Sequence, residues 1–291
     1  MRVTQSMLTN NMLRNLSDSY ARMGKYQEQL ATGKKISRPS DDPVVAMKGM
    51  NYRTQLTEVE QFKRNLGEMH NWMDNSDAAL DKATQAMQRV RELTIQSSND
   101  TYSDEQRGNI AKEIAQLKEH IVDIANTKVN NKYIFNGSDT LNPPVNLESN
   151  PAVSENQEAV NIEISKGVLL KANINPTNVF SENLFNDLNA LQTALEEGGE
   201  DALDRMVETV DSHINNIINE RADLGARMNR VDLVEDRLAQ QEVTATRILS
   251  ENEDADIEKV ITNLKTQESV HRAALGVGAR IIQPTLMDFL R

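Results

Sequence analysis

Cysteine is absent from this 291-residue sequence, which excludes disulfide bonds, thiolate metal sites and cysteine nucleophiles. Aromatic residues make up only 4% of the chain, so aromatic pockets that stack a base or a cofactor are not expected. No apolar run approaches the ~20 residues that a membrane-spanning helix requires. The first residues lack the apolar core of a secretory signal peptide. We therefore expect no membrane insertion and no cleaved signal peptide.

Signals for catalysis and for nucleic-acid binding are also missing. The formal net charge of −12 argues against a nucleic-acid binder, because phosphate contacts need a basic surface. The four histidines have no partner at the spacing of helical metal ligands, and no phosphate-binding glycine loop or nucleophile elbow occurs. We therefore predict that the protein is not an enzyme, with no catalytic residue, no cofactor and no metal.

Charge is unevenly distributed along the chain. Residues 1–53 hold nine basic and four acidic residues, so the acidic excess lies in the remainder. This polarity favours association of one end with the body of a neighbouring subunit. A solvated basic face without a partner explains the pattern equally well. Composition alone leaves both interpretations open.

The distribution of proline predicts where long helices occur. Residues 44–142 and 177–283 contain no proline, and proline costs about 3 kcal/mol in a helix interior. Apolar residues recur there at three- and four-residue spacing, which predicts four helices. Three of these helices cover residues 43–98, 184–197 and 201–250. The fourth begins at the capping box at 103–106. Alternation of apolar and polar residues over 160–174 predicts a β-hairpin.

The sequence thus predicts a mainly α fold, an elongated bundle of long antiparallel helices with a small β-rich insert and termini that form coiled coils. The expected segments are an N-terminal assembly helix and turn at 1–42, core helices at 43–135 and 184–253, a β-rich outer insert at 136–183, and a C-terminal assembly helix at 254–291. Trp72 and a stripe of methionines are expected in the core rather than at a cofactor site. The stripe consists of Met47, Met50, Met69, Met73 and Met87.

Both ends of the chain carry amphipathic segments of roughly 30 residues. Polar residues interrupt the C-terminal apolar seam at Glu268 and His271, and Gly276 and Gly278 loosen it. One interpretation is that the two segments complete the core. The other is that they are weakly ordered alone and pair as a coiled coil when subunits stack.

Several motifs resemble those of the bacterial flagellin superfamily, in the same order and spacing. The run ISRPSDDPVVA at 36–46 resembles the turn after the first terminal helix, and ERADLGARMNR at 220–230 is similar to a motif on the long helix of the second half. QLATGK at 29–34 resembles the end of the family's first terminal helix, and DAD at 254–256 resembles the break before its last helix. The motif residues are Arg38, Pro39, Asp41, Asp42 and Pro43 in the turn, and Arg221, Leu224, Gly225, Asn229 and Arg230 on the helix.

Within that superfamily, the start of the chain, residues 132–140 and the end from position 271 are most similar to the hook-associated protein 3 branch. The resemblance implies a structural protein that forms the junction ring between hook-associated protein 1 and the flagellin filament. It implies synthesis in the cytoplasm, binding of an export chaperone to the C-terminal seam, and passage through the type III export apparatus to an extracellular place in the flagellum. The implied subunit contacts are Met7, Leu13, Leu16, Tyr20, Met23 and Leu30 with Leu264, Leu275, Ile282, Leu286 and Phe289.

Two other functions remain as alternatives. The near one is a flagellin filament subunit, and the distant one is a secreted helical translocator or adhesin, which also lacks a signal peptide. Asp41 and Asp42 are expected to cap a turn rather than to form a catalytic pair. The acidic run at 251–256 lacks the glycine and the ligand spacing of a calcium loop, so it is expected to be a solvated helix boundary.

Overall fold

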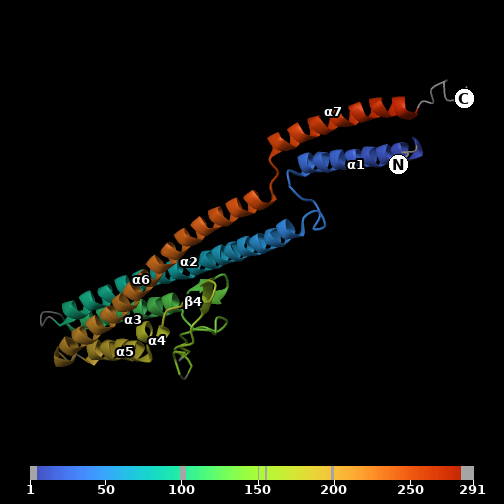
Figure 1. Ribbon diagram of the computed structural model, residues 1–291. Coiled ribbons are helices and arrows are strands. Elements are labelled where there is room, and N and C mark those ends of the chain that lie inside the picture. The colour runs from blue at the N-terminus through green and yellow to red at the C-terminus, as the bar shows by residue number, and fades with distance from the viewer. Residues whose placement is uncertain (1–4, 99–102, 150, 155, 198–199, 283–291) are drawn as a thin grey trace, which may run out of the picture. The chain divides into compact units, whose positions relative to one another are not determined.

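The computed structural model describes residues 5–98, 103–149, 151–154, 156–197 and 200–282 (Figure 1). The elements are α1 (Gln5–Thr32), α2 (Pro43–Ser97), α3 (Asp104–Ala125), β1 (Lys128–Val129), β2 (Lys132–Tyr133), β3 (Asn161–Ser165), β4 (Val168–Lys171), α4 (Pro176–Val179), α5 (Glu182–Glu197), α6 (Glu200–Glu253) and α7 (Ile257–Ile282). The predicted fold class, mainly helical with long antiparallel helices and small sheets, is confirmed.

The chain forms two compact units. The first contains α1, the turn after it, α2 to Glu58, α6 from Gln241 and α7, and the second contains residues 59–240. The long helices α2 and α6 therefore each contribute one end to each unit.

Local signals set several helix ends. The Asp42 side chain accepts hydrogen bonds from the backbone N–H groups of Val44 and Val45, so Asp42 caps α2 and Pro43 stands first in the helix. Ser103 and Gln106 form the predicted capping box of α3. The expected break at 254–256 is also confirmed, because α6 ends and α7 begins on either side of it.

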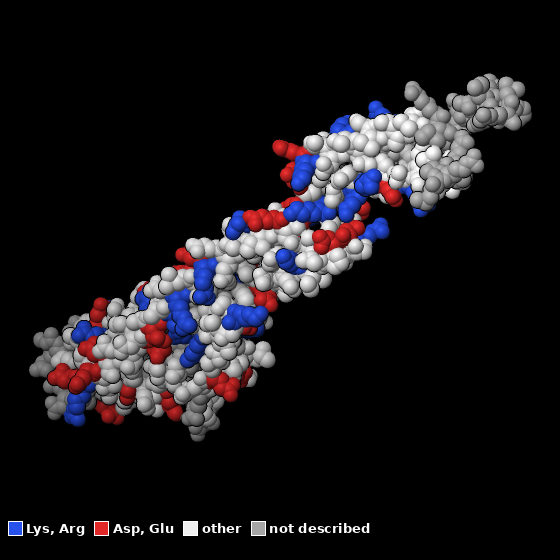
Figure 2. Space-filling model, viewed as in Figure 1, with Lys and Arg blue, Asp and Glu red and all other residues white. Residues whose placement is uncertain are grey.

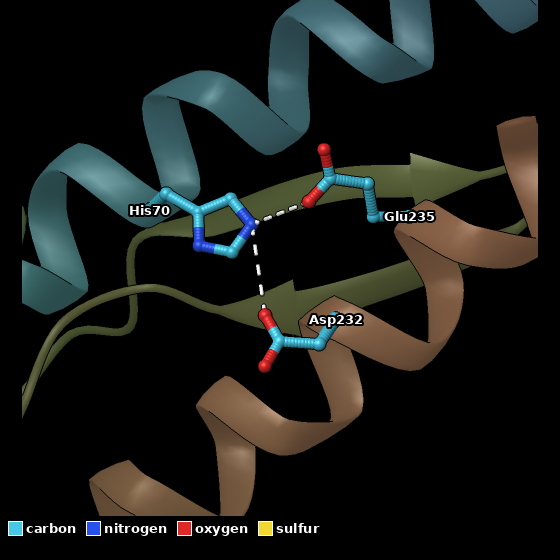
Figure 3. Close-up of side chains that lie close together, drawn as sticks. All are labelled: His70, Asp232 and Glu235. Atoms are coloured by element: carbon cyan, nitrogen blue, oxygen red, sulfur yellow. Dashed lines mark hydrogen bonds and ion pairs between the residues drawn. The ribbon is translucent and has the colours of Figure 1, made fainter.

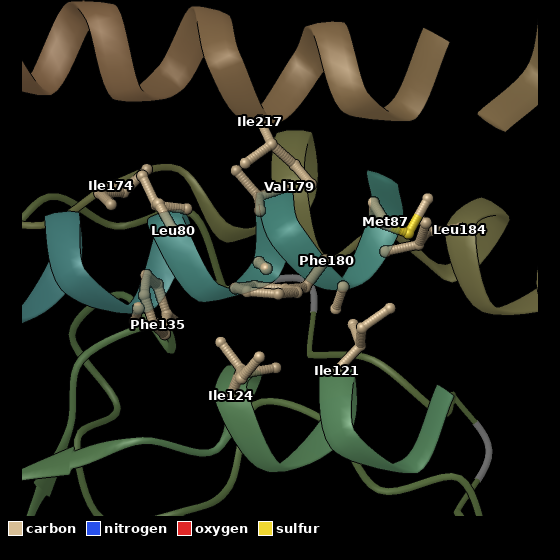
Figure 4. Packing of buried hydrophobic residues seen from close by; sticks show 14 of the residues in the cluster. Leu80, Met87, Ile121, Ile124, Phe135, Ile174, Val179, Phe180, Leu184 and Ile217 are labelled. Atoms are coloured by element: carbon tan, nitrogen blue, oxygen red, sulfur yellow. The ribbon is translucent and has the colours of Figure 1, made fainter. Parts of the chain in front are cut away.

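The second unit holds the hydrophobic core. Long apolar side chains of α2, α3, α5 and α6 meet there, and the rings of Phe135 and Phe180 pack edge to face with centroids 5.1 Å apart (Figure 4). Trp72 is buried as predicted. The methionine prediction holds for Met69, Met73 and Met87, which are fully buried. It is wrong for two others at the start of α2, where the side chains of Met47 and Met50 are exposed.

Two small antiparallel sheets lie between α3 and α4. The predicted hairpin is β3–β4, which turns at Gly167 with φ of +76°. The other hairpin, β1–β2, was not expected, and it turns through Asn130 and Asn131, both with positive φ. The segment around β3–β4 is part of the core, because Ile164, Leu170, Ala172, Ile174, Val179 and Phe180 are all buried.

In the first unit, α1 and α7 pack side by side and antiparallel (Figure 1). The Gln267 amide donates to the buried Ser19 hydroxyl at 2.8 Å. Nearer the other end of the pair, a Cβ at Gly278 would overlap the end of the Met12 side chain, so glycine leaves room there for that methionine. The two ends of the chain thus pair within one molecule, whereas the sequence-based hypothesis had them pair on stacking. The expected weak order of these helices in the isolated chain stays a prediction.

Candidate assembly surface

A short backbone bridge joins the end of α1 to the break between α6 and α7. The Lys35 N–H donates to the Glu253 carbonyl at 2.6 Å, and the Ala255 N–H donates to the Gly33 carbonyl at 2.8 Å. Lys34 and Asp254 face each other as an antiparallel pair within it. Gly33 has φ of +68°, a conformation that suits glycine at a helix C-terminus. The two sequence motifs 29–34 and 254–256 therefore meet in one joint.

Ion pairs reinforce this joint. Lys34 Nζ lies 2.6 Å from Asp254 Oδ1, and this hydrogen bond raises the pKa of Lys34 and lowers that of Asp254. Glu253 is buried, and its carboxylate binds Arg53 at 2.7 Å, with Lys34 at 3.6 Å. The expected helix boundary at 251–256 is confirmed, but the expectation that it is solvated is wrong for Glu253, an interior carboxylate that holds α2 and the turn against α6.

The motif turn is organised by its two aspartates. Asp41 Oδ2 accepts hydrogen bonds from the backbone N–H groups of Arg38 at 3.1 Å and Ser37 at 3.3 Å. These bonds, that of Arg38 foremost, lower the pKa of Asp41. With Asp42 capping α2, both carboxylates serve backbone groups. The prediction of a capped turn is confirmed.

The α1–α7 pair leaves an apolar surface exposed. Among the described contact candidates, Met7, Leu13, Tyr20 and Leu275 are 57%, 53%, 70% and 50% exposed. Leu16, Met23, Leu30 and Leu264 are half-buried. The side chain of Ile282 and all of Leu286 and Phe289 lie outside the described residues. Figure 2 shows a broad area without charged side chains over this pair.

Further exposed apolar residues extend the surface, and sequence analysis missed them as contact candidates. They share the first unit with the candidates above and are Leu8, Val44, Met47, Met50, Val243, Ile257, Ile261, Val270 and Val277. In the described part of this unit, Val260 is the one large apolar side chain that is buried. We use the term apolar surface of the first unit for these residues together with Met7, Leu13, Tyr20 and Leu275. Large exposed apolar patches on a monomer mark interaction sites, so the concentration of exposed apolar side chains in this unit makes it a candidate assembly surface.

The motif on the long helix has a different role, in the second unit. Arg221 binds Asp77 at 2.7 Å and Asp81 at 2.5 Å, and these contacts raise its pKa. Leu224, one turn further along α6, is fully buried. The arginine and the leucine therefore fasten α6 to α2 and to the core. Gly225 is half-exposed, and Asn229 and Arg230 are exposed.

Comparison with known proteins agrees with this arrangement. A family model described as the bacterial flagellin N-terminal helical region matches residues 3–140, and one described as the C-terminal helical region matches residues 207–290. Together they cover well over half of the chain. The chain belongs to the flagellin family. Its members are structural proteins of the flagellum, and this chain is a structural protein rather than an enzyme.

Individual relatives match over most of the chain. It is 25% identical to flagellar hook-associated protein 3 of Escherichia coli K12, over 94% of this chain and 95% of that protein. It is 26% identical to a flagellin of Bacillus subtilis 168, over 97% of both chains. Among solved structures, a putative flagellar hook-associated protein from Vibrio parahaemolyticus matches with a TM-score of 0.69 at 18% identity, covering 74% of this chain and all of that one. The FlgL protein of Bacillus cereus matches with a TM-score of 0.60 at 23% identity, over 69% and 99%. These structures share the fold.

The flagellin-family motifs and the structure coincide at the joint and on α6. The helix-end motif at 29–34 and the 254–256 break meet in one joint in the first unit, and the helix motif fastens α6 in the second. No helix in the described part of the chain has the length and apolar character needed to cross a bilayer.

Proposed function

We propose that this protein forms the junction between the flagellar hook and the flagellin filament. The support is twofold. The hook-associated protein 3 of Escherichia coli matches nearly end to end, and the motifs at both ends of the chain resemble that branch of the family. The physical basis is the apolar surface of the first unit, which a neighbouring subunit would cover.

The observation that carries the proposal is the contrast between the two units. Residues 59–240 enclose a core of their own, whereas the α1–α7 pair buries little and exposes Met7, Leu13, Tyr20 and Leu275. Fully burying one leucine side chain contributes about 1.5–3 kcal/mol, so several half-exposed ones supply a substantial driving force for association. The second unit is thus a stable body, and the first unit is the part that joins subunits.

The proposed partners follow from the resemblance to junction proteins. They are further copies of this chain in a ring, hook-associated protein 1 on one side and flagellin on the other. Before assembly, an export chaperone would cover the C-terminal seam, and the type III export apparatus would carry the chain to its extracellular place. The proposed subunit contacts are the eleven apolar residues of the two terminal segments.

A deletion strain tests this proposal. Without the gene, we expect hooks to remain while flagellin appears in the culture medium, because the filament has no base to join. Retention of normal filaments would overturn the proposal. In complementation, Leu275→Glu should abolish incorporation while the purified monomer keeps its helical content, since that side chain is half-exposed. Leu141→Glu is the matched control at an 80% exposed leucine of the second unit, and it should restore filaments.

The alternative is a filament subunit, which the near-complete match to the Bacillus subtilis flagellin favours. Polymerisation separates the two functions. A filament subunit grows long filaments from purified monomer, and a junction protein does not. Filaments in such an assay, with the wild-type chain alone, would replace the junction proposal by this one.

A further inference from the structure

A histidine of α2 and two carboxylates of α6 converge on one point of the second unit (Figure 3). His70 Nε2 lies 3.0 Å from Glu235 Oε2 and 3.9 Å from Asp232 Oδ1. One nitrogen, one oxygen of Asp232 and one of Glu235 all lie within 4.8 Å of one another. The two acidic residues are three positions apart on α6, so they lie on the same face of that helix.

The single hydrogen on Nε2 of His70 can bond only one of the two carboxylates. Nε2 of an imidazole carries at most one hydrogen, so it donates to Glu235 and leaves Asp232 beyond hydrogen-bond distance. In the described part of the chain, His70 is the only partner of either carboxylate, and Asp232 makes no hydrogen bond there. Two negative charges therefore face one nitrogen that can serve only one of them.

A divalent cation fits the same three atoms. Zn²⁺ binds imidazole nitrogen and carboxylate oxygen at about 2.0–2.2 Å, which places neighbouring ligand atoms about 3–3.5 Å apart. The two separations from His70 Nε2, 3.0 and 3.9 Å, bracket that range. The carboxylate oxygens of Asp232 and Glu235 lie within 4.8 Å of each other, so binding requires these exposed side chains to close by up to about 1.3 Å. The side chain of His70 is 28% exposed, and those of Asp232 and Glu235 are 64% and 53% exposed, which leaves room for water as the remaining ligands.

We propose that His70, Asp232 and Glu235 form a binding site for a divalent d-block cation of the Zn²⁺ class. The imidazole selects such ions over Mg²⁺ and Ca²⁺, which prefer oxygen ligands alone. Because the ligands come from α2 and α6, 165 residues apart between His70 and Glu235, a bound ion ties the two long helices together. The ion binds the folded chain and not the dispersed ligands of the unfolded one, so it raises the unfolding temperature.

Isothermal titration of the untagged full-length protein with Zn²⁺ tests the proposal. We expect one ion per chain, undiminished by excess Mg²⁺, and a rise in the unfolding temperature on adding Zn²⁺. His70→Ala and Glu235→Gln should each weaken Zn²⁺ binding at least about tenfold, the lower end of the cost of losing even an outer-shell partner.

Asp232→Asn is the decisive variant. Since Asp232 makes no hydrogen bond to His70, this variant should unfold at the wild-type temperature without metal and lose the Zn²⁺-dependent rise. The matched control is His213→Ala, because His213 pairs with a single carboxylate, that of Asp187 at 2.8 Å, and its loss should leave Zn²⁺ binding unchanged. Wild-type Zn²⁺ affinity in Asp232→Asn, or absence of Zn²⁺ binding by the wild-type chain, would overturn the proposal and leave an ordinary ion pair.

Discussion

Gly49 on α2 offers a sensitive test of the joint, because its neighbour is the interior carboxylate of Glu253. A Cβ at position 49 would lie 2.4 Å from Glu253 Oε1 and 3.2 Å from its carboxyl carbon. The carboxylate cannot move away freely, since its other oxygen binds Arg53 at 2.7 Å. Gly49→Ala must therefore displace an anchored group.

Two opposing effects set the change in the free energy of unfolding that Gly49→Ala causes. Replacing glycine by alanine inside a helix contributes about 1 kcal/mol in favour of folding. Losing a hydrogen bond to a charged group costs about 1.5–3 kcal/mol, and the lower end applies because Arg53 is 63% exposed and its charge is screened. We expect Gly49→Ala to lower the free energy of unfolding by roughly 0.5–1 kcal/mol.

Gly24→Ala is the matched control in the same unit, because a Cβ at that position would have nothing within 4 Å of it. It should raise the free energy of unfolding by about 0.5–1 kcal/mol. The assay is urea unfolding followed by circular dichroism, with amide hydrogen exchange over residues 45–58 to localise the effect. In the Glu253→Ala background, Gly49→Ala should become stabilising. If Gly49→Ala stabilises the wild-type chain as much as Gly24→Ala does, the account of a clamped Glu253 is refuted.

Two further predictions concern the core and the pH dependence of the joint. Leu224→Ala should cost about 2–5 kcal/mol of stability because this side chain is fully buried, while Leu233→Ala, 71% exposed, should stay within about 0.5 kcal/mol. Equal effects in urea unfolding would contradict the burial pattern. The Lys34–Asp254 pair should stabilise the joint by less than about 1 kcal/mol, since both side chains are partly exposed. Asp254, whose pKa is lowered in the folded state, stabilises the fold at pH values above its unfolded pKa near 3.8. This stabilisation is lost as the pH falls through the lower folded pKa. Lys34, whose pKa is raised in the folded state, stabilises the fold at pH values below its unfolded pKa of 10.5. This stabilisation is lost as the pH rises through the higher folded pKa. Hydrogen exchange over residues 33–35 between pH 3 and 8 checks the acid limb, and a Lys34→Met variant with the wild-type profile would contradict it.

Local signals explain why much of the fold could be predicted. The caps at Asp42 and Ser103, the long proline-free stretches and the alternation over 160–174 each act through neighbouring residues, and the structure contains the elements they specify. The β1–β2 hairpin escaped prediction because each strand has only two residues, too few for an alternating pattern.

Long-range contacts explain what could not be predicted. In the sequence Glu253 is one more acid in a polar run, and its burial depends on Arg53, which lies 200 positions away. The convergence of His70 with Asp232 and Glu235 likewise needs the register between α2 and α6. Met47 and Met50 show a third limit, because their spacing marks an apolar helix face without telling whether the same chain covers it.

The central claim is that assembly covers the apolar surface of the first unit, and the absence of cysteine makes it directly measurable. Leu275→Cys introduces a single thiol at a half-exposed position of α7, and Leu141→Cys introduces one at an exposed position of the second unit. Maleimide labelling rates are compared between the free monomer and isolated flagella that contain each variant. We predict that the thiol at position 275 reacts readily in the monomer and is strongly protected in the flagellum, while that at position 141 reacts in both. Equal labelling at position 275 in the monomer and in the flagellum would contradict the account.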